Sequence, residues 1–334
     1  MNHRVAIVGA GVSGLTCGVV FAERGHRTTI FAREIGQETT SAVAGALWFP
    51  YDVEPADKAI PWALETYQTL IELARNVENG VSMIELHQLS RMGEIQIPDW
   101  AVPLGARRLS VATAQCCRAG GSHGKRLDTA RRLQDFRSGF SLDVPLMDTT
   151  IYLDYLANRF LKADGQITKK VRLENLEDVD PQSDLVINCA GIGARELVHD
   201  CDLEPHRGQV AIVPRIKDLS YAVVCDDAPF MYAIPRTNDC LFGGTNDLSD
   251  DLAVDSATTA RIVAECSRTL KIEKPNVLTE RVGLRPFRKS GVRIERARLQ
   301  DGRTVVHNYG HGGAGFTLSW GCAVEVLQRG TASS

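Results

Sequence analysis

The chain has 334 residues, and its 44% hydrophobic content suits one large domain or two moderate domains with a sizeable core. Its 38 lysine and arginine residues against 41 acidic residues give a formal net charge of −3, which excludes the broad positive field that attracts nucleic acid or anionic lipid. No apolar run approaches the roughly 20 residues that cross a bilayer, so we expect no membrane contact. The nine cysteines have no CxxC or zinc-type spacing, which favours free thiols in the cytoplasm and no metal site.

The first 34 residues predict a strand–helix–strand unit that binds a dinucleotide. A strand-like apolar run over residues 5–8 leads into GAGVSG, in which Gly9, Gly11 and Gly14 have the GxGxxG spacing. The first glycine permits a tight turn, the second lets the backbone approach a pyrophosphate, and the third lets the helix pack on the strand. Glu34 follows a second strand-like run, at the distance where an acidic residue meets the ribose hydroxyls. The motif alone does not distinguish FAD from NAD.

The middle of the chain alternates between helical and strand patterns. Residues 60–80 have apolar side chains at helical spacing and predict an amphipathic helix that ends at Asn79-Gly80. Residues 147–165 predict a second helix, with Asp148 or Thr149 as its N-cap. Residues 183–194 read as a buried strand that runs into a glycine turn. The basic, turn-rich segment 113–136 lacks periodicity and predicts a surface loop.

From Gly208 onward, short β-rich runs separated by turns predict a mixed or antiparallel sheet. A helix is expected over residues 256–270, a strand over 305–310, and a closing helix after the glycine-rich HGGAG. We therefore predict an α/β fold: a Rossmann-like dinucleotide-binding domain with a discontinuous second α+β domain for substrate, built on a mixed or antiparallel sheet. The first domain takes residues 1–50, 137–195 and 286–334, and the second takes 51–136 and 196–285.

Several motifs, in this order, resemble those of the D-amino acid oxidase family, the FAD-dependent oxidases that include D-aspartate oxidase. They are GAGVSG, FARE, TTSAVAGALWFPY, VINCAGIGA, HRGQV, MYAIPR, VGLRPFR and HNYGHGGAGFTLSWG. The resemblance covers nearly the whole chain, from residue 5 to about residue 327. It implies FAD as the cofactor and oxidative deamination of a D-amino acid, with oxygen as the second substrate and hydrogen peroxide as a product. It leaves a homodimer open.

The resemblance also implies roles for individual residues. Arg285 would pair with the substrate carboxylate, Tyr232 would hydrogen-bond it, and Gly313 would offer its carbonyl to the substrate amine. An arginine fork matches a planar carboxylate, as a lysine would not. The residues expected at the cofactor are Gly9, Gly11, Val12, Gly14, Arg33, Glu34, Thr39, Thr40, Ser41, Ala46, Leu47, Trp48, Val171, Gly191, Gly312, Gly315, Phe316 and Thr317. His307 and His311 are then structural rather than metal ligands, because no carboxylate or thiol cluster joins them.

Three positions depart from the family pattern. Ala228 and Asn246 stand where family members place a second tyrosine or, in mammalian D-aspartate oxidases, an arginine, and Phe49 replaces a glutamine. These differences lower the expectation of an acidic substrate and favour a neutral D-amino acid. The alternatives are a glycine, N-methyl amino acid or pathway-specific amine oxidase of the same fold, a flavin-binding protein without oxidase turnover, and an NAD dehydrogenase.

Overall fold

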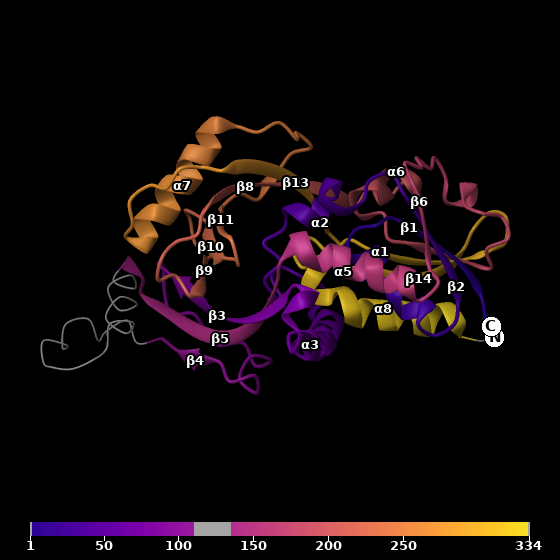
Figure 1. The fold of residues 1–334 in the computed structure, drawn as a ribbon, viewed down its shortest axis with the longest axis horizontal. Coiled ribbons are helices and arrows are strands. Elements are labelled where there is room, and N and C mark those ends of the chain that lie inside the picture. Colours follow the sequence, from indigo (N-terminus) through magenta and orange to yellow (C-terminus); the bar gives the residue numbers. More distant parts are fainter. Residues whose placement is uncertain (1, 110–134, 333–334) are drawn as a thin grey trace, which may run out of the picture.

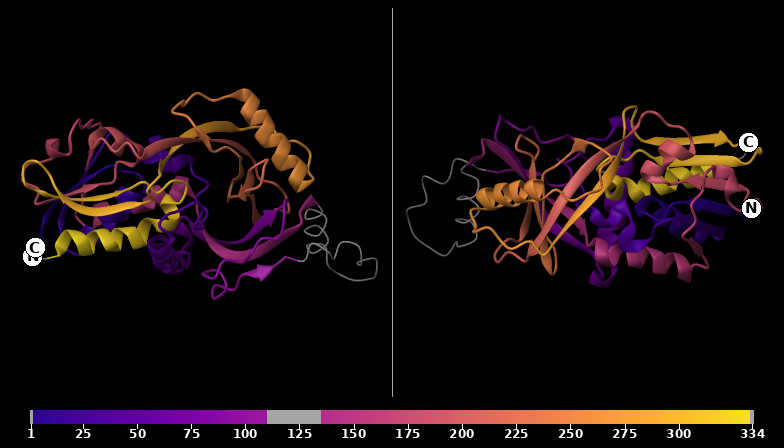
Figure 2. Two further views of the ribbon diagram at one scale, coloured as in Figure 1. Left: turned by 180° about the vertical axis from the view of Figure 1, so that it is seen from behind. Right: turned by 90° about the horizontal axis from the view of Figure 1, so that it is seen from above.

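The structure is a computed structural model that describes residues 2–109 and 135–332. The surface loop expected over residues 113–136 therefore lies outside the described residues, apart from its last two positions. Two sheets, one at each end of an elongated molecule, organise the chain, and both termini lie at the end that holds the first sheet (Figures 1 and 2). Among the described residues, no helix is long and apolar enough to cross a membrane.

The first sheet has six strands in the order β14-β15-β7-β1-β2-β6. Their bounds are β1 Arg4–Val8, β2 Arg27–Ala32, β6 Gln166–Lys169, β7 Leu185–Asn188, β14 Arg293–Arg298 and β15 Thr304–Tyr309. All neighbours are parallel except β14 and β15. Because parallel strands end at one edge, the glycine-rich turns after β1, β7 and β15 meet there.

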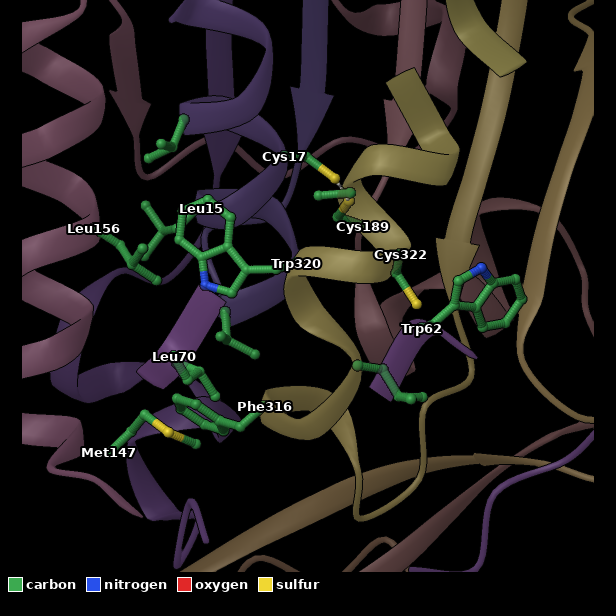
Figure 3. Packing of buried hydrophobic residues seen from close by; sticks show 14 of the residues in the cluster. Leu15, Cys17, Trp62, Leu70, Met147, Leu156, Cys189, Phe316, Trp320 and Cys322 are labelled. Carbon is green, nitrogen blue, oxygen red and sulfur yellow. Dashed lines mark hydrogen bonds between the residues drawn. The ribbon is translucent and has the colours of Figure 1, made fainter. Parts of the chain in front are cut away.

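Four helices pack together beside the first sheet: α1 Val12–Ala22, α3 Ala56–Leu73, α5 Thr149–Lys162 and α8 Gly315–Thr331. Their apolar side chains interlock around Trp320 and Phe316 of α8 (Figure 3). Trp320 satisfies its buried polar atom by donating from Nε1 to the hydroxyl of Tyr152 at 2.8 Å. Asp148 caps α5 by accepting from the Thr150 amide, as its sequence position predicts.

Both boundaries of helix α3 differ from the prediction. The helix expected over residues 60–80 begins at Ala56 and ends at Leu73, and Asn79 instead closes the 3-10 turn η2 Val77–Asn79. Gly80 follows with φ 72°, a conformation that favours glycine. The apolar spacing identified the helix but could not locate its end, because the Asn-Gly signal belongs to this separate turn.

The second sheet has nine strands in the order β12-β8-β11-β10-β9-β3-β5-β4, with β13 paired antiparallel to β8. Their bounds are β3 Val81–Ser90, β4 Arg107–Arg108, β5 Ser138–Met147, β8 Leu203–Pro214, β9 Tyr221–Cys225, β10 Met231–Pro235, β11 Asp239–Gly243, β12 Asp247–Leu248 and β13 Thr279–Arg288. The pair β3–β9 is parallel. Helix α7 Ser256–Leu270 matches its predicted range and packs against Ala233 and Phe242, on one face of this sheet.

The remaining short elements are η1 Gly36–Glu38, α2 Thr40–Val43, η5 Leu176–Asp178, η6 Gly191–Gly193 and α6 Ala194–Leu197. The division of the chain into a cofactor domain and a substrate domain stays a prediction. Strand β5, which the predicted boundaries assign to the cofactor domain, pairs with β3 in the second sheet. Residues 138–147 form an almost fully buried strand, and such a run carries no mark of the sheet it will join.

Helices α3 and α8 approach closely at Gly321, and this contact yields a stability prediction. A Cβ at Gly321 would lie 2.3 Å from the carbonyl oxygen of Trp62, so Gly321→Ala should push the two helices apart. We expect a loss of about 1–3 kcal/mol in the free energy of unfolding, measured by chemical denaturation. Gly93→Ala is the matched control, since its Cβ would meet nothing within 4 Å. Equal stability of the two variants would contradict the packing described.

Candidate functional site

A cavity of about 1230 Å³ extends from the glycine-rich edge of the first sheet to the second sheet. The turn after β1, the end of β2 and helix α2 line one end, and β10 and β13 line the other. Helix α2 lies beside β13, between the two sheets (Figure 1). The volume exceeds that of a typical single-ligand pocket and suits a large cofactor beside a small substrate.

The glycines of GAGVSG take two different structural roles. Gly9 has φ 105°, and a Cβ there would lie 2.4 Å from the carbonyl oxygen of Cys189, so the turn requires glycine. Gly9, Gly11 and Val12 line the cavity. Gly14 does not: a Cβ there would lie 1.9 Å from the carbonyl oxygen of Gly9. Gly14 therefore lets α1 pack on β1, as the third glycine of the motif is expected to do, and its place beside the cofactor stays a prediction.

The N-terminus of α1 opens onto the cavity with a positive electrostatic character. Its N-cap, Gly11, has no side chain to cap the helix, and the first turn holds no acidic residue. The Val12 amide donates to Ser41 Oγ at 3.0 Å, which fixes the serine hydroxyl beside the helix end. Arg281 of β13 also lines the cavity, and its guanidinium donates to Gln37 Oε1 at 3.3 Å. A helix N-terminus without an acidic side chain and a cation in the same cavity favour an anionic group.

At the far end of this region, the predicted adenosine contacts lie together. Arg33, Glu34 and Val171 all line the cavity. Arg33 and Glu34 form an exposed ion pair at 2.9 Å, which contributes little stability because solvent screens it. The Val171 amide donates to the carbonyl of Ala32 at 3.1 Å, so a backbone contact from Val171 to a ligand would have to use its carbonyl oxygen.

Most of the residues that the sequence placed in the site line the cavity. The three exceptions are Gly14, described above, Trp48 and Thr317. Trp48 is fully buried, and its Nε1 donates to the Ala63 carbonyl at 3.0 Å. Thr317 exchanges hydrogen bonds with the backbone of Phe49, at 3.1 Å to the amide and 3.0 Å to the carbonyl. Both side chains thus support the cavity wall without lining it. Their neighbours Leu47 and Phe49 line the cavity instead.

Arg285 lies on β13 and points a cation into the cavity. Its Nη1 donates to the Thr245 carbonyl at 2.9 Å and to Asn246 Oδ1 at 3.2 Å. No aspartate or glutamate pairs with Arg285 within residues 2–109 and 135–332. The guanidinium occupies the space above Gly208, where a Cβ would lie 2.6 Å from Nη1. A half-buried guanidinium without a carboxylate partner is prepared for an anionic ligand.

Tyr232 lies on β10 next to Arg285. A Cβ at Gly243, its partner on β11, would lie 2.0 Å from the tyrosine Cζ, so this glycine also makes room for a site side chain. Burial raises the pKa of Tyr232, while the charge of Arg285 and a hydrogen bond from it act in the opposite direction. The phenol stays protonated at neutral pH and can donate a hydrogen bond to an anion that Arg285 holds.

The structure adds residues that sequence reasoning missed. Tyr51 and Phe230 line the cavity with their rings nearly parallel, at 2° and 6.3 Å between centroids. Burial raises the pKa of Tyr51 to about 12, with the charges of Asp226 and Asp52 adding to the effect. Tyr51 ends the quoted stretch TTSAVAGALWFPY, so its position was visible. Gly208 and Gly243 had no sequence signal, because their role depends on pairing between distant strands.

His311 and His307 are buried and uncharged. Desolvation lowers the pKa of each to about 4. His311 Nε2 donates to Asn308 Oδ1 at 3.0 Å, which holds the glycine-rich turn after β15. The described part of the chain has no cluster of three or more histidine, cysteine or acidic side chains that could hold a metal ion.

Comparison with known proteins places the chain among flavin-dependent oxidoreductases. The family model described as FAD dependent oxidoreductase, DAO, matches residues 4–329. A D-amino-acid oxidase of Streptomyces coelicolor is 38% identical over 98% of this chain and 96% of its own length. A D-aspartate oxidase of Homo sapiens is 31% identical over 97% and 94%.

Solved structures agree on the fold. Glycine oxidase from Geobacillus kaustophilus has a TM-score of 0.79 at 17% identity, covering 98% of this chain and 94% of its own. L-alpha-glycerophosphate oxidase from Mycoplasma pneumoniae with FAD bound has a TM-score of 0.75 at 15% identity, covering 100% and 96%. The predicted α/β class, with a Rossmann-like part and a mixed second sheet, is confirmed.

The two histidines yield a pH prediction. A histidine whose pKa is lower in the folded state than the ordinary 6.5 binds its proton more readily when unfolded, so stability falls as pH drops from about 6.5 towards 4. The slope should reach up to about 1.4 kcal/mol per pH unit for each group. His311→Gln keeps a donor for Asn308 but removes the titrating group. The free energy of unfolding, measured by chemical denaturation at a series of pH values, should therefore change less with pH in the variant. An identical slope in both proteins would show that His311 does not titrate in this way.

Proposed function

The chain belongs to the DAO family of FAD dependent oxidoreductases, and we propose that it oxidises a D-amino acid to the 2-oxo acid, ammonia and hydrogen peroxide. The observation that carries this proposal is Arg285: a half-buried guanidinium without a carboxylate partner in the described chain, set in the same cavity as the GAGVSG turn. The likeness to glycine oxidase concerns the fold and does not favour glycine as the substrate. A cytoplasmic location and a homodimer stay predictions.

The residues of the first sheet's edge fit FAD. Gly11 and the open N-terminus of α1, with Thr40 and Ser41 beside it, would hold the pyrophosphate. Arg33, Glu34 and the Val171 carbonyl would surround the adenosine, and Thr39 the adjoining phosphate or ribityl chain. The flavin ring would lie along the main chain of Ala46 and Leu47. It would also lie along the turn after β15 and the start of α8, which contribute Gly312, Gly315 and Phe316. FAD, when bound, supplies the acceptor for the hydride from the substrate's α-carbon and is reoxidised by oxygen.

The protein's own contribution is to orient the substrate. Arg285 would hold the α-carboxylate in its planar fork, and Tyr232 would add a hydrogen bond to it. Gly313, which also lines the cavity, would accept from the α-amino group through its carbonyl. These three contacts fix the carboxylate and the amino group of the substrate. They therefore decide which face of the α-carbon meets the flavin ring. Because the pKa values of Tyr51 and Tyr232 are both raised, neither phenol serves as a base at neutral pH.

Substitution of Arg285 tests the proposal. Arg285→Ala should lower kcat/KM for D-amino acids by about a hundredfold or more, chiefly through KM, because the carboxylate loses a charged bidentate partner. Arg285→Lys should recover only part of the loss, since an ammonium cannot hold the carboxylate in plane. Flavin absorbance per protein should stay unchanged in both variants. Lys289→Ala, at the end of the same strand and exposed, is the matched control. Unaltered kinetics in Arg285→Ala would refute the site.

A further inference from the structure

Asp226 places a carboxylate in the same cavity as Arg285. It follows β9 directly, lines the cavity and remains open to solvent. Gln88 of β3 donates from Nε2 to Asp226 Oδ2 at 2.7 Å. The Gln88 carboxamide is buried, and its Oε1 has no hydrogen-bond partner among the described residues. A buried amide therefore fixes this carboxylate in position while contributing no charge to neutralise it.

The neighbouring Asp227 has a structural role, because its carboxylate binds groups of the protein itself. It accepts from Ser90 Oγ at 2.9 Å and from the Met92 amide at 3.0 Å, and it faces Arg91. Desolvation raises its pKa, but these hydrogen bonds and the Arg91 charge outweigh that effect and lower it. Asp227 is thus fully used in holding the loop to β3.

Asp226 has the opposite environment. Desolvation raises its pKa, the hydrogen bond from Gln88 opposes this, and the charges of Asp227 and Asp52 raise it further. No lysine or arginine of residues 2–109 or 135–332 pairs with it. A carboxylate repelled by two others and lacking a cation gains most from a cation supplied by a ligand.

Aromatic surface connects Asp226 to the carboxylate anchor. Tyr51 lines the cavity together with Asp226 and Arg285, and the charges of both act on its hydroxyl: that of Asp226 raises the pKa of Tyr51 and that of Arg285 lowers it. The Tyr51 and Phe230 rings stack, and Phe230 in turn contacts Tyr232 at 5.6 Å between ring centroids. Such a surface suits a methylene chain that carries a positive end, because the chain packs on the rings and the cation is attracted to their faces.

We propose that this cavity selects D-amino acids with a cationic side chain, the class of lysine, ornithine and arginine, with the α-carboxylate at Arg285 and the side-chain cation at Asp226. This inference rests on the proposed function and deepens it. It replaces the neutral substrate expected from the sequence: Phe49 does line the cavity, but it packs edge-on against Trp100, and Asp226 supplies a charge on the wall that the motifs did not indicate.

A comparison of substrates matched in shape but not in charge tests the inference. Wild-type enzyme should show kcat/KM about tenfold or more higher for D-arginine than for D-citrulline, and for D-lysine than for D-norleucine, because each pair differs by one cation that Asp226 can bind. In Asp226→Asn, which keeps an acceptor for Gln88, both preferences should fall to near unity while D-citrulline and D-norleucine are oxidised as before. Asp250→Asn, another exposed carboxylate of the cavity wall, is the matched control and should keep both preferences.

The possible outcomes separate this inference from the proposed function. The role of Asp226 would be overturned if the wild type had equal kcat/KM for the charged and the neutral substrate of each pair. It would also be overturned if the preference survived in Asp226→Asn. Neither result would contradict D-amino acid oxidation itself. Loss of the preference in Asp250→Asn as well would show a general field of the cavity instead of a site at Asp226, and would also overturn it. Failure of every D-amino acid to reduce the flavin would remove the proposed function itself.

Discussion

The whole site depends on one electrostatic constraint: the guanidinium of Arg285 is half-buried and has no carboxylate partner in the described chain. A protein seldom leaves such a charge unpaired unless a ligand completes it. Its hydrogen bonds to the Thr245 carbonyl and Asn246 fix the fork but do not neutralise it. Tyr51, Phe230 and Asp226 line the same cavity as Arg285, and we propose that the side chain of an amino acid held by its carboxylate at Arg285 lies along them.

The fold creates that position by removing side chains around it. Gly208 on β8 and Gly243 on β11 leave the space that Arg285 and Tyr232 occupy. The same device recurs at the first sheet, where Gly9 and Gly14 let the turn, the helix and the neighbouring strand approach within distances that a Cβ would forbid. In both sheets, glycines thus stand where a neighbouring side chain or backbone segment comes too close for a Cβ.

The sequence predicted the fold class, the helices α5 and α7 and most of the cavity wall, because local periodicity and glycine spacing are properties of contiguous residues. It did not show that the side chains of Trp48 and Thr317 pack behind the cavity wall, and their place beside the cofactor stays a prediction. Whether a side chain next to a cofactor motif faces the ligand or the core depends on strand direction and on partners such as Ala63, which are set by tertiary packing. Asp226 was missed because its neighbours in space, Gln88 and Tyr51, are far from it in the chain.

Anaerobic reduction of the protein's flavin by separate panels of D- and L-amino acids is the decisive experiment, because it requires the cofactor, the carboxylate anchor and the substrate orientation at once. We expect a yellow protein whose flavin is bleached by D-amino acids and left oxidised by their L-enantiomers. A colourless protein, a flavin that no amino acid reduces, or equal bleaching by both enantiomers would contradict this expectation.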